Sequence, residues 1–183
     1  MPMWPAASPY VTAVGGVVNG AMPESAWSGS SGGFSNIYDQ PSWQTEAIAT
    51  FFENAAAAGT LPPSNMFNAT GRGFPDIAAQ SVSYPVVANG ITMSVAGTSC
   101  ASPCSGGIFG LLNDARLAAG KSSLGFLNPM LYGNAAALND CTQGTQGGCS
   151  GIDGFPAVAG WDAVTGLGSP NYTALLDVVM ALP

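Results

Sequence analysis

Ala96-Gly97-Thr98-Ser99-Cys100-Ala101-Ser102-Pro103 is the stretch of sequence that decides the fold. A β-rich run precedes it, and apolar residues recur at helical spacing from Pro103 to Gly120, so Ser99 stands where a strand passes into a helix. Such a corner holds a hydroxyl clear of its neighbours and directs backbone N–H groups and the positive end of the helix dipole at charge that develops beside it. This position is what a serine nucleophile needs.

The helix that follows this corner is predicted to be buried behind the nucleophile. Its apolar residues are expected on one face: Ile108, Leu111, Leu112 and Ala115. Gly106-Gly107 would let the helix pack closely against its neighbours.

Strand patterns occur on both sides of the central stretch. Tyr10 to Val14 is predicted to be a buried parallel strand with a tight exit at Gly15-Gly16, and Phe74 to Ala79 a second short buried strand. Val86 to Val95 predicts a hairpin, because Asn89-Gly90 suits the positive φ angles of a type I′ turn. This hairpin delivers the chain to Ser99.

Helix patterns alternate with these strands. Helices are predicted from Pro41 to Gly59, over a short segment capped by Asn128-Pro129, and after a cap at Ser169-Pro170. The inward residues of the last helix are expected to be Leu175, Leu176 and Val179. The alternation predicts a single α/β domain of layered architecture with a mainly parallel sheet.

Charge and composition exclude several functions. Ten acidic residues face three basic ones, and 7% of all residues are charged. Nucleic acid is therefore not an expected partner, and no apolar stretch is long enough to span a bilayer. The chain has no histidine. This excludes a Ser-His-Asp triad built from the chain alone and a histidine-bound metal.

The cysteines allow several disulfide arrangements. Four cysteines are present, and the sequence does not select among their pairings. We favour a bond between Cys141 and Cys149 across a Gly-rich loop. Cys100 and Cys104 are four residues apart in the predicted helix, a spacing that fits disulfide geometry poorly, so buried free thiols are expected there.

Two further features have a functional and a structural interpretation. Asp76 could act in catalysis, but a buried Asp usually accepts hydrogen bonds from backbone or from a partner such as Arg72, and this structural role is favoured. The Gly-rich stretch Ser28 to Ser35 could cradle a phosphate, but no Gly-Lys-Ser follows it, so a flexible loop is the preferred interpretation.

Segments over nearly the whole chain resemble the sedolisins, or serine-carboxyl peptidases, and within that family the tripeptidyl peptidase branch. The central stretch resembles the nucleophile segment of the subtilisin-like serine peptidases, Gly-Thr-Ser-x-Ala-Ser-Pro, and this resemblance implies that Ser99 is the nucleophile. The other matching segments are residues 5–16, 32–36, 67–72, 75–79, 124–129 and 160–166. The resemblance implies a subtilisin-like three-layer fold, of which residues 1–183 would be only the C-terminal portion of the catalytic domain.

The resemblance also implies a chemistry of which this chain holds one part. Enzymes of that family use a Ser-Glu-Asp triad with a further Asp in the oxyanion hole; a carboxylate of pKa near 4 still accepts a proton in acid, where an imidazole of pKa about 6.5 is already protonated. The family's Glu precedes its Asp by four residues, and no Glu here does so: Glu24, Glu46 and Glu53 lie in other contexts. We therefore expect the chain to be inactive alone. A peptide or protein substrate would be cleaved only with the missing N-terminal half of the domain.

A calcium ion is the cofactor that the resemblance implies. Matched by motif, Asp140 and Asp162 would supply carboxylates, and Cys141, Val158 and Gly160 would supply carbonyl oxygens. Hard oxygen ligands from a loop are what Ca²⁺ requires. Two solvated loop aspartates are the alternative.

Location and overall role follow from the same comparison. The sequons at Asn68 and Asn171 are compatible with a secreted glycoprotein, and we expect a secreted, lysosomal or vacuolar protein, although Met1 to Pro5 do not resemble a signal peptide.

The alternative to a peptidase portion is a non-catalytic Ca²⁺-binding secreted domain or a decayed gene fragment. An esterase is disfavoured, because no Gly-x-Ser-x-Gly elbow is present. An isolated half of a layered sheet would expose an apolar face, so self-association of the free chain is expected.

Overall fold

A three-stranded sheet lies at the centre of the computed structural model, which describes residues 2–18, 22–148 and 152–183. The central strand β1 (Val14–Val18) pairs in parallel with β5 (Ile77–Gln80) and antiparallel with β2 (Ser25–Ala26). The remaining strands form two-stranded units: β3 (Gly33–Asp39) with β4 (Gly71–Phe74), β6 (Tyr84–Ala88) with β7 (Ile91–Val95), and β8 (Leu138–Asn139) with β9 (Ser169–Pro170).

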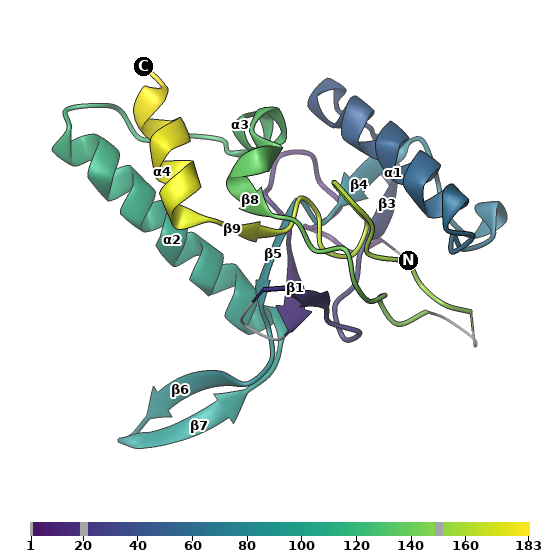
Figure 1. Ribbon diagram of the computed structural model, residues 1–183, viewed down its shortest axis with the longest axis horizontal. Coiled ribbons are helices and arrows are strands. Elements are labelled where there is room, and N and C mark those ends of the chain that lie inside the picture. The colour runs from purple at the N-terminus through teal and green to yellow at the C-terminus, as the bar shows by residue number, and fades with distance from the viewer. Residues whose placement is uncertain (1, 19–21, 149–151) are drawn as a thin grey trace.

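Helices lie on both sides of this sheet. α2 (Thr98–Ala118) and α4 (Tyr172–Ala181) lie on one side and α1 (Thr45–Ala57) on the other, as Figure 1 shows. The shorter helices are α3 (Asn128–Gly133) and the 3-10 turns η1 (Ser42–Gln44), η2 (Ser64–Met66) and η3 (Ala135–Ala137). The predicted α/β layered class is confirmed. In the described part of the chain, the parallel component of the sheet is the pair β1–β5. None of the helices described there is long and apolar enough to cross a membrane.

An aromatic cluster fills the core on the α1 side. Phe34 of β3 is buried and lies at its centre. The rings around it, with centroids 5.3–6.2 Å away, are Phe51, Phe52, Phe67, Phe155 and Trp161. These rings come from α1, from the loop before β4 and from the segment 155–161, so the cluster ties distant parts of the chain together.

The first strand begins later than predicted. Tyr10 to Val14 was expected to form it, but β1 runs over Val14–Val18 and contains Gly15-Gly16 instead of ending there. Side chains take the backbone groups of the earlier residues: Asp76 accepts from the N–H of Ala13 at 2.7 Å, and Asn128 donates to the carbonyl of Val11 at 3.0 Å. Asn128, predicted as part of a cap, is thus used elsewhere, and α3 has no side-chain cap.

Strand β1 requires glycine at positions 15 and 16, because the neighbouring segments leave no room for a side chain there. A Cβ on Gly16 would lie 2.3 Å from the Ser81 hydroxyl, and one on Gly15 would lie 2.7 Å from the Val164 carbonyl oxygen. β1 can therefore approach the segments on both sides only because these two residues are glycines.

The cap of the last helix also differs from the prediction. Ser169 and Pro170 form β9, and the side chain of Asn171 accepts a hydrogen bond from the N–H of Ala174 at 3.3 Å. Asn171 is therefore the N-cap. Leu175 and Val179 face the core as predicted, while Leu176 is half-buried.

Helix α2 begins at Thr98, five residues before the predicted start, and buries a different face. Its buried residues are Cys100, Ala101, Ser105, Phe109, Leu112 and Arg116. Of the predicted inward residues only Leu112 is fully buried, and Leu111 is 59% exposed. Helix α2 therefore has apolar residues on more of its surface than the rest of this chain covers.

Candidate active site

Two backbone hydrogen bonds set the position of the segment that carries Ser99. The N–H of Ser81, just after β5, donates to the carbonyl of Val17 at 2.9 Å, and the carbonyl of Ser81 accepts from the N–H of Gly97 at 2.7 Å. Residues 81 and 97 are thus held together, and the hairpin β6–β7 is an excursion between them. Its turn residues Asn89 and Gly90 have φ angles of 51° and 76°, which confirms the predicted type I′ turn.

Ser99 is the second residue of α2 and is exposed. Gly97 precedes the helix with φ 154°, a value that favours glycine, and no side chain caps the first turn. Pro103 has no N–H to donate to the carbonyl of Ser99, so the helical ladder is interrupted there. The result is a serine hydroxyl at the solvent-facing, positive end of a 21-residue helix.

No carboxylate accompanies this hydroxyl in the described part of the chain. The stretch from Ile77 to Asn113 contains no Asp, Glu, Lys or Arg, and no hydrogen bond joins the Ser99 side chain to an acidic residue of the described ranges. The geometry therefore supplies an exposed candidate nucleophile without a base.

The two cysteines beside Ser99 are free thiols, as predicted for both. Cys100 is buried and Cys104 is half-buried. The hydroxyl of Tyr84 at the start of β6 lies against Cys104, and the hydrogen bond with this thiol raises the pKa of Tyr84. The root of the hairpin is therefore in contact with the first turns of α2.

Asp76 has the favoured structural role. Its Oδ2 accepts from the guanidinium of Arg72 at 2.5 Å and its Oδ1 accepts from the Tyr132 hydroxyl at 3.1 Å, with Asp76 and Arg72 both fully buried. Burial raises the pKa of Asp76, and the positive charge of Arg72 opposes that effect. Gln44, whose Nε2 donates to Tyr132 at 2.6 Å, completes the network. Gln44 and Tyr132 were not found from the sequence, because neither stands in a recognisable pattern.

The residues predicted to hold Ca²⁺ come together in one loop cluster. Asp140 accepts from the N–H of Gly160 at 2.8 Å, and Asp162 accepts from the N–H of Val158 at 3.2 Å. In residues 2–18, 22–148 and 152–183, the carbonyl oxygens of Cys141, Val158 and Gly160 accept no backbone hydrogen bond. Those three acceptors therefore remain available to a cation.

No basic side chain pairs with the two carboxyl groups of this cluster. Asp162 is completely buried, and burial raises its pKa to about 7 although several hydrogen bonds oppose the shift. Burial also raises the pKa of Asp140. The three basic residues of the chain lie elsewhere: Arg72 pairs with Asp76, and Arg116 and Lys121 donate to carbonyls at the end of α4. A buried carboxyl with neutral partners alone either keeps its proton or takes a bound cation. Among the described residues, no three Cys, Asp or Glu side chains lie close enough together to hold a metal by themselves, so a cation here would need backbone carbonyl oxygens as well.

Thr165 is a member of this cluster that sequence reasoning missed. Its hydroxyl and N–H both donate to Asp162, at 3.0 and 2.7 Å. The signal was the spacing Asp162-Ala163-Val164-Thr165, in which an Asp side chain bonds the backbone of its own turn.

The predicted disulfide and the two sequons are not part of the candidate active site or of the loop cluster around Asp162. Cys149 of the favoured disulfide lies outside the described residues, and Cys141 is a free, buried thiol whose pKa burial raises to about 11. At the sequons, the Asn68 amide donates to the Ser35 carbonyl at 2.9 Å and the Asn171 amide to Asn139 at 3.3 Å.

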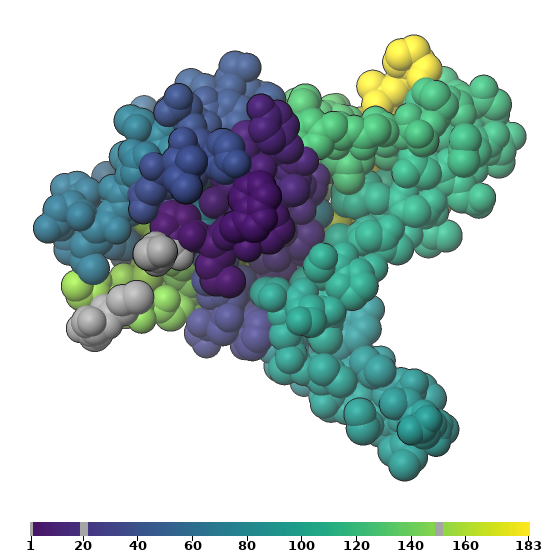
Figure 2. All heavy atoms as spheres, turned by 180° about the vertical axis from the view of Figure 1, so that it is seen from behind, coloured from purple at the N-terminus to yellow at the C-terminus, as the bar shows by residue number. Residues whose placement is uncertain are grey.

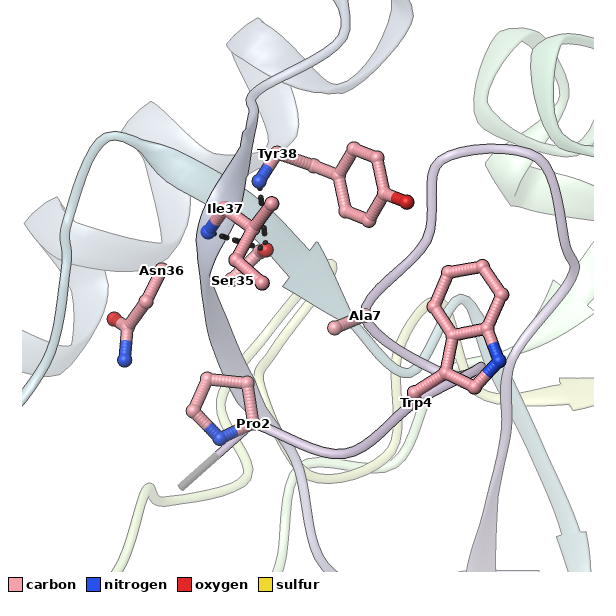
Figure 3. Close-up of a pocket in the computed structure, with 7 residues that line it drawn as sticks. All are labelled: Pro2, Trp4, Ala7, Ser35, Asn36, Ile37 and Tyr38. Atoms are coloured by element: carbon pink, nitrogen blue, oxygen red, sulfur yellow. Dashed lines mark hydrogen bonds between the residues drawn. The ribbon is translucent and has the colours of Figure 1, made fainter.

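A cavity of about 220 Å³ lies at the N-terminal segment, away from the central stretch in sequence. Figure 3 shows its lining: Pro2, Trp4, Ala7, Ser35, Asn36, Ile37 and Tyr38. Trp4 stacks on Tyr38 with ring centroids 6.3 Å apart, and the Ser35 hydroxyl accepts the N–H of Tyr38 at 2.9 Å. This lining contains no charged residue, and the Ser35 hydroxyl is used within it.

Comparison with known proteins identifies the relatives of this chain. No family model matches it. Tripeptidyl-peptidase sed4 of Aspergillus fumigatus is 45% identical over 201 residues, which cover 99% of this chain and 34% of that protein. Tripeptidyl-peptidase 1 of Rattus norvegicus is 44% identical over 98% of this chain and 33% of its own length. The chain thus spans about a third of the length of these relatives.

A solved structure shows the same fold. Pseudomonas sedolisin, a serine-carboxyl proteinase solved with two molecules of pseudo-iodotyrostatin, matches with a TM-score of 0.75 at 26% identity. The match covers 97% of this chain and 48% of sedolisin. The chain is therefore a homologue of the sedolisin-family tripeptidyl-peptidases and shares the subtilisin-like fold of sedolisin, which confirms the predicted resemblance.

Proposed function

We propose that this chain is the nucleophile-bearing portion of an acid-acting serine-carboxyl peptidase of the endo- or tripeptidyl type. One observation carries the proposal: Ser99 is exposed on the first turn of α2, in a chain 45% identical to a tripeptidyl-peptidase over 99% of its length. The substrate class is peptides or proteins, and a secreted, lysosomal or vacuolar location accords with it.

The chemistry follows from the position of the hydroxyl. Ser99 Oγ would attack the carbonyl carbon of the scissile peptide bond, and its proton would pass to a carboxylate that remains ionised in acid. The positive end of α2 would stabilise the negative charge that develops on the substrate oxygen. The base, its orienting Asp and the oxyanion Asp would come from the portion of the domain that this chain does not span.

Hydrolysis of an N-terminally free tripeptide substrate at about pH 4, near the carboxyl pKa, tests this proposal. We expect no turnover by residues 1–183 alone. Turnover should appear when they replace the corresponding residues of tripeptidyl-peptidase sed4, and Ser99→Ala should abolish it while Ser102→Ala, on the same exposed turn, keeps most of it. Ser99-dependent turnover by the chain alone would refute the inactivity, and turnover in the Ser99→Ala chimera would refute the nucleophile.

Ca²⁺ is the proposed cofactor. Asp140 and Asp162 would bind it with carboxylates and Cys141, Val158 and Gly160 with carbonyl oxygens; the ion would neutralise the buried Asp162 and join segment 140–141 to segment 158–162. Calorimetric titration should show binding by the wild type and by the exposed control Asp153→Ala, and none by Asp140→Ala. Equal binding by Asp140→Ala would refute the ligand set.

The alternative is a non-catalytic Ca²⁺-binding secreted domain or a decayed gene fragment. It is favoured by the absence of any Glu with an Asp four residues later in this sequence. A sed4 chimera that binds Ca²⁺ but never hydrolyses peptide would support this alternative.

A further inference from the structure

One face of the hairpin β6–β7 is apolar except for the hydroxyl of Tyr84 at its root. Residues opposite one another on paired strands share a face, and successive residues alternate between faces. The pairs on one face are Tyr84 with Val95, Val86 with Met93, and Ala88 with Ile91. We call these six residues the apolar hairpin face. The opposite face carries the pairs Pro85 with Ser94 and Val87 with Thr92, and is half polar.

Three residues of this face, Val86, Ile91 and Met93, are exposed, and the other three are half-buried. Figures 1 and 2 show the hairpin projecting from the body as an isolated arm. Ile91 is 65% exposed and Met93 49%, and the two strands pack mainly on each other. Monomeric proteins seldom expose a continuous apolar surface of this kind unless something binds it.

The apolar hairpin face continues onto α2. Tyr84, at the root of the face, contacts Cys104. Residues three and seven positions further along the helix, Gly107 and Leu111, lie on the same side of it as Cys104. Leu111 is exposed, and open space surrounds the position of a Cβ on Gly106, Gly107 or Gly110. We call Cys104, Gly107 and Leu111 the α2 stripe.

The chemistry of this surface selects an apolar occupant. No charged residue occurs between Ile77 and Asn113, so the surface has no cation for a nucleic acid or an anionic lipid headgroup.

The solved relative supplies an occupant of the right size. This chain matches 48% of sedolisin, so a full domain of that fold contains about as much protein again. We propose that the apolar hairpin face and the α2 stripe are the surface on which the remaining portion of a sedolisin-type catalytic domain packs. The inference rests on the proposed function for the identity of this portion. It adds that the contact is made on both sides of Ser99, by the arm before it and by the helix after it.

The test is binding between residues 1–183 and the separately produced catalytic portion of tripeptidyl-peptidase sed4 that this chain does not span, measured by sedimentation velocity. Met93→Asp places a charge on the apolar hairpin face, and Thr92→Asp places the same charge on the opposite face of the same strand. Leu111→Asp alters the α2 stripe, while Leu117→Asp alters a residue of equal exposure, 59%, on another side of α2. Circular dichroism and thermal unfolding check that each variant folds.

We expect Met93→Asp and Leu111→Asp to weaken the complex at least about tenfold, and Thr92→Asp and Leu117→Asp to leave it within about twofold. Equal effects of the paired variants, or no complex with the wild type, would overturn the inference. It would also be overturned if Met93→Asp removed binding to neutral phosphatidylcholine vesicles, or removed self-association while leaving the complex with the sed4 portion unchanged, since the occupant would then be a membrane or a second copy. A face-dependent complex that hydrolyses no peptide would uphold this inference and refute the proposed function.

Discussion

The two sides of the sheet differ in how far this chain completes its own core. On the α1 side, Phe34 is buried within a cluster of five other rings from three segments. On the α2 side, Leu111 and the hairpin residues Ile91 and Met93 are exposed. Their segments are nevertheless as apolar in sequence as those on the α1 side. The difference shows that an apolar pattern indicates which residues a segment can bury. Whether those residues are buried depends on whether another segment packs against them.

The largest loss of stability is expected when the aromatic cluster on the α1 side is disrupted. Phe34→Ala should destabilise the chain by roughly 3–5 kcal/mol, because it removes a ring that contacts all the others and leaves a cavity. Urea unfolding followed by circular dichroism measures this. Phe126→Ala, an exposed ring, is the control. A loss below about 1 kcal/mol would mean that the cluster is not tightly packed.

Breaking the buried ion pair between Arg72 and Asp76 should lower the free energy of unfolding by almost as much as Phe34→Ala. Asp76→Asn leaves the guanidinium of Arg72 buried without its counter-charge and should lower the free energy of unfolding by about 3 kcal/mol. Asp114→Asn, an exposed acid on α2, should change it little. The double variant Arg72→Met with Asp76→Asn removes the buried charge while the new amide keeps an acceptor for the N–H of Ala13, so it should recover part of the loss. If the double variant is no more stable than Asp76→Asn, the uncompensated charge is not the cause.

A smaller effect is expected at the start of α4, where the helix cap was mislocated from sequence. Asn171→Ala removes the acceptor for the N–H of Ala174 and should cost about 1 kcal/mol. Thr173→Ala, exposed on the first turn of α4, should be near neutral. The same urea titration distinguishes them. Equal stability of the two variants would show that Asn171 does not cap α4.

The smallest effect is expected on the open side. Leu111→Ala in the isolated chain should change stability by less than about 0.5 kcal/mol, because the side chain has little to pack against. A loss near the 2–5 kcal/mol typical of a buried leucine would show that this side is covered in the free chain. Analytical ultracentrifugation of the same samples would then reveal whether a second copy covers it.

Local patterns predicted the elements whose contacts are close in sequence. The type I′ turn at Asn89-Gly90 depends on the φ angles of two adjacent residues, and α1 depends on spacing within one helix, so both were found. The exposed join at Ser99 was found for the same reason, because Gly97 and Pro103 lie within a few residues of it.

Elements that depend on distant partners were misplaced. The start of β1 depends on Asp76, 63 residues from Ala13, and on Asn128, 117 residues from Val11. The cluster of Asp140 with Gly160 and Asp162 with Thr165 was partly found through the family resemblance, yet the burial of Asp162 could not be read from a loop sequence.

The sequence by itself determined the α/β class, the nucleophile candidate at a strand–helix join and the relationship to the sedolisins, since each depends on short motifs and their order. Only the tertiary structure decided which face of α2 is buried, where strand β1 begins, and which side of the molecule stays open. Those outcomes depend on which segments meet in space, and a side chain's burial is a property of its neighbours as much as of its own chemistry.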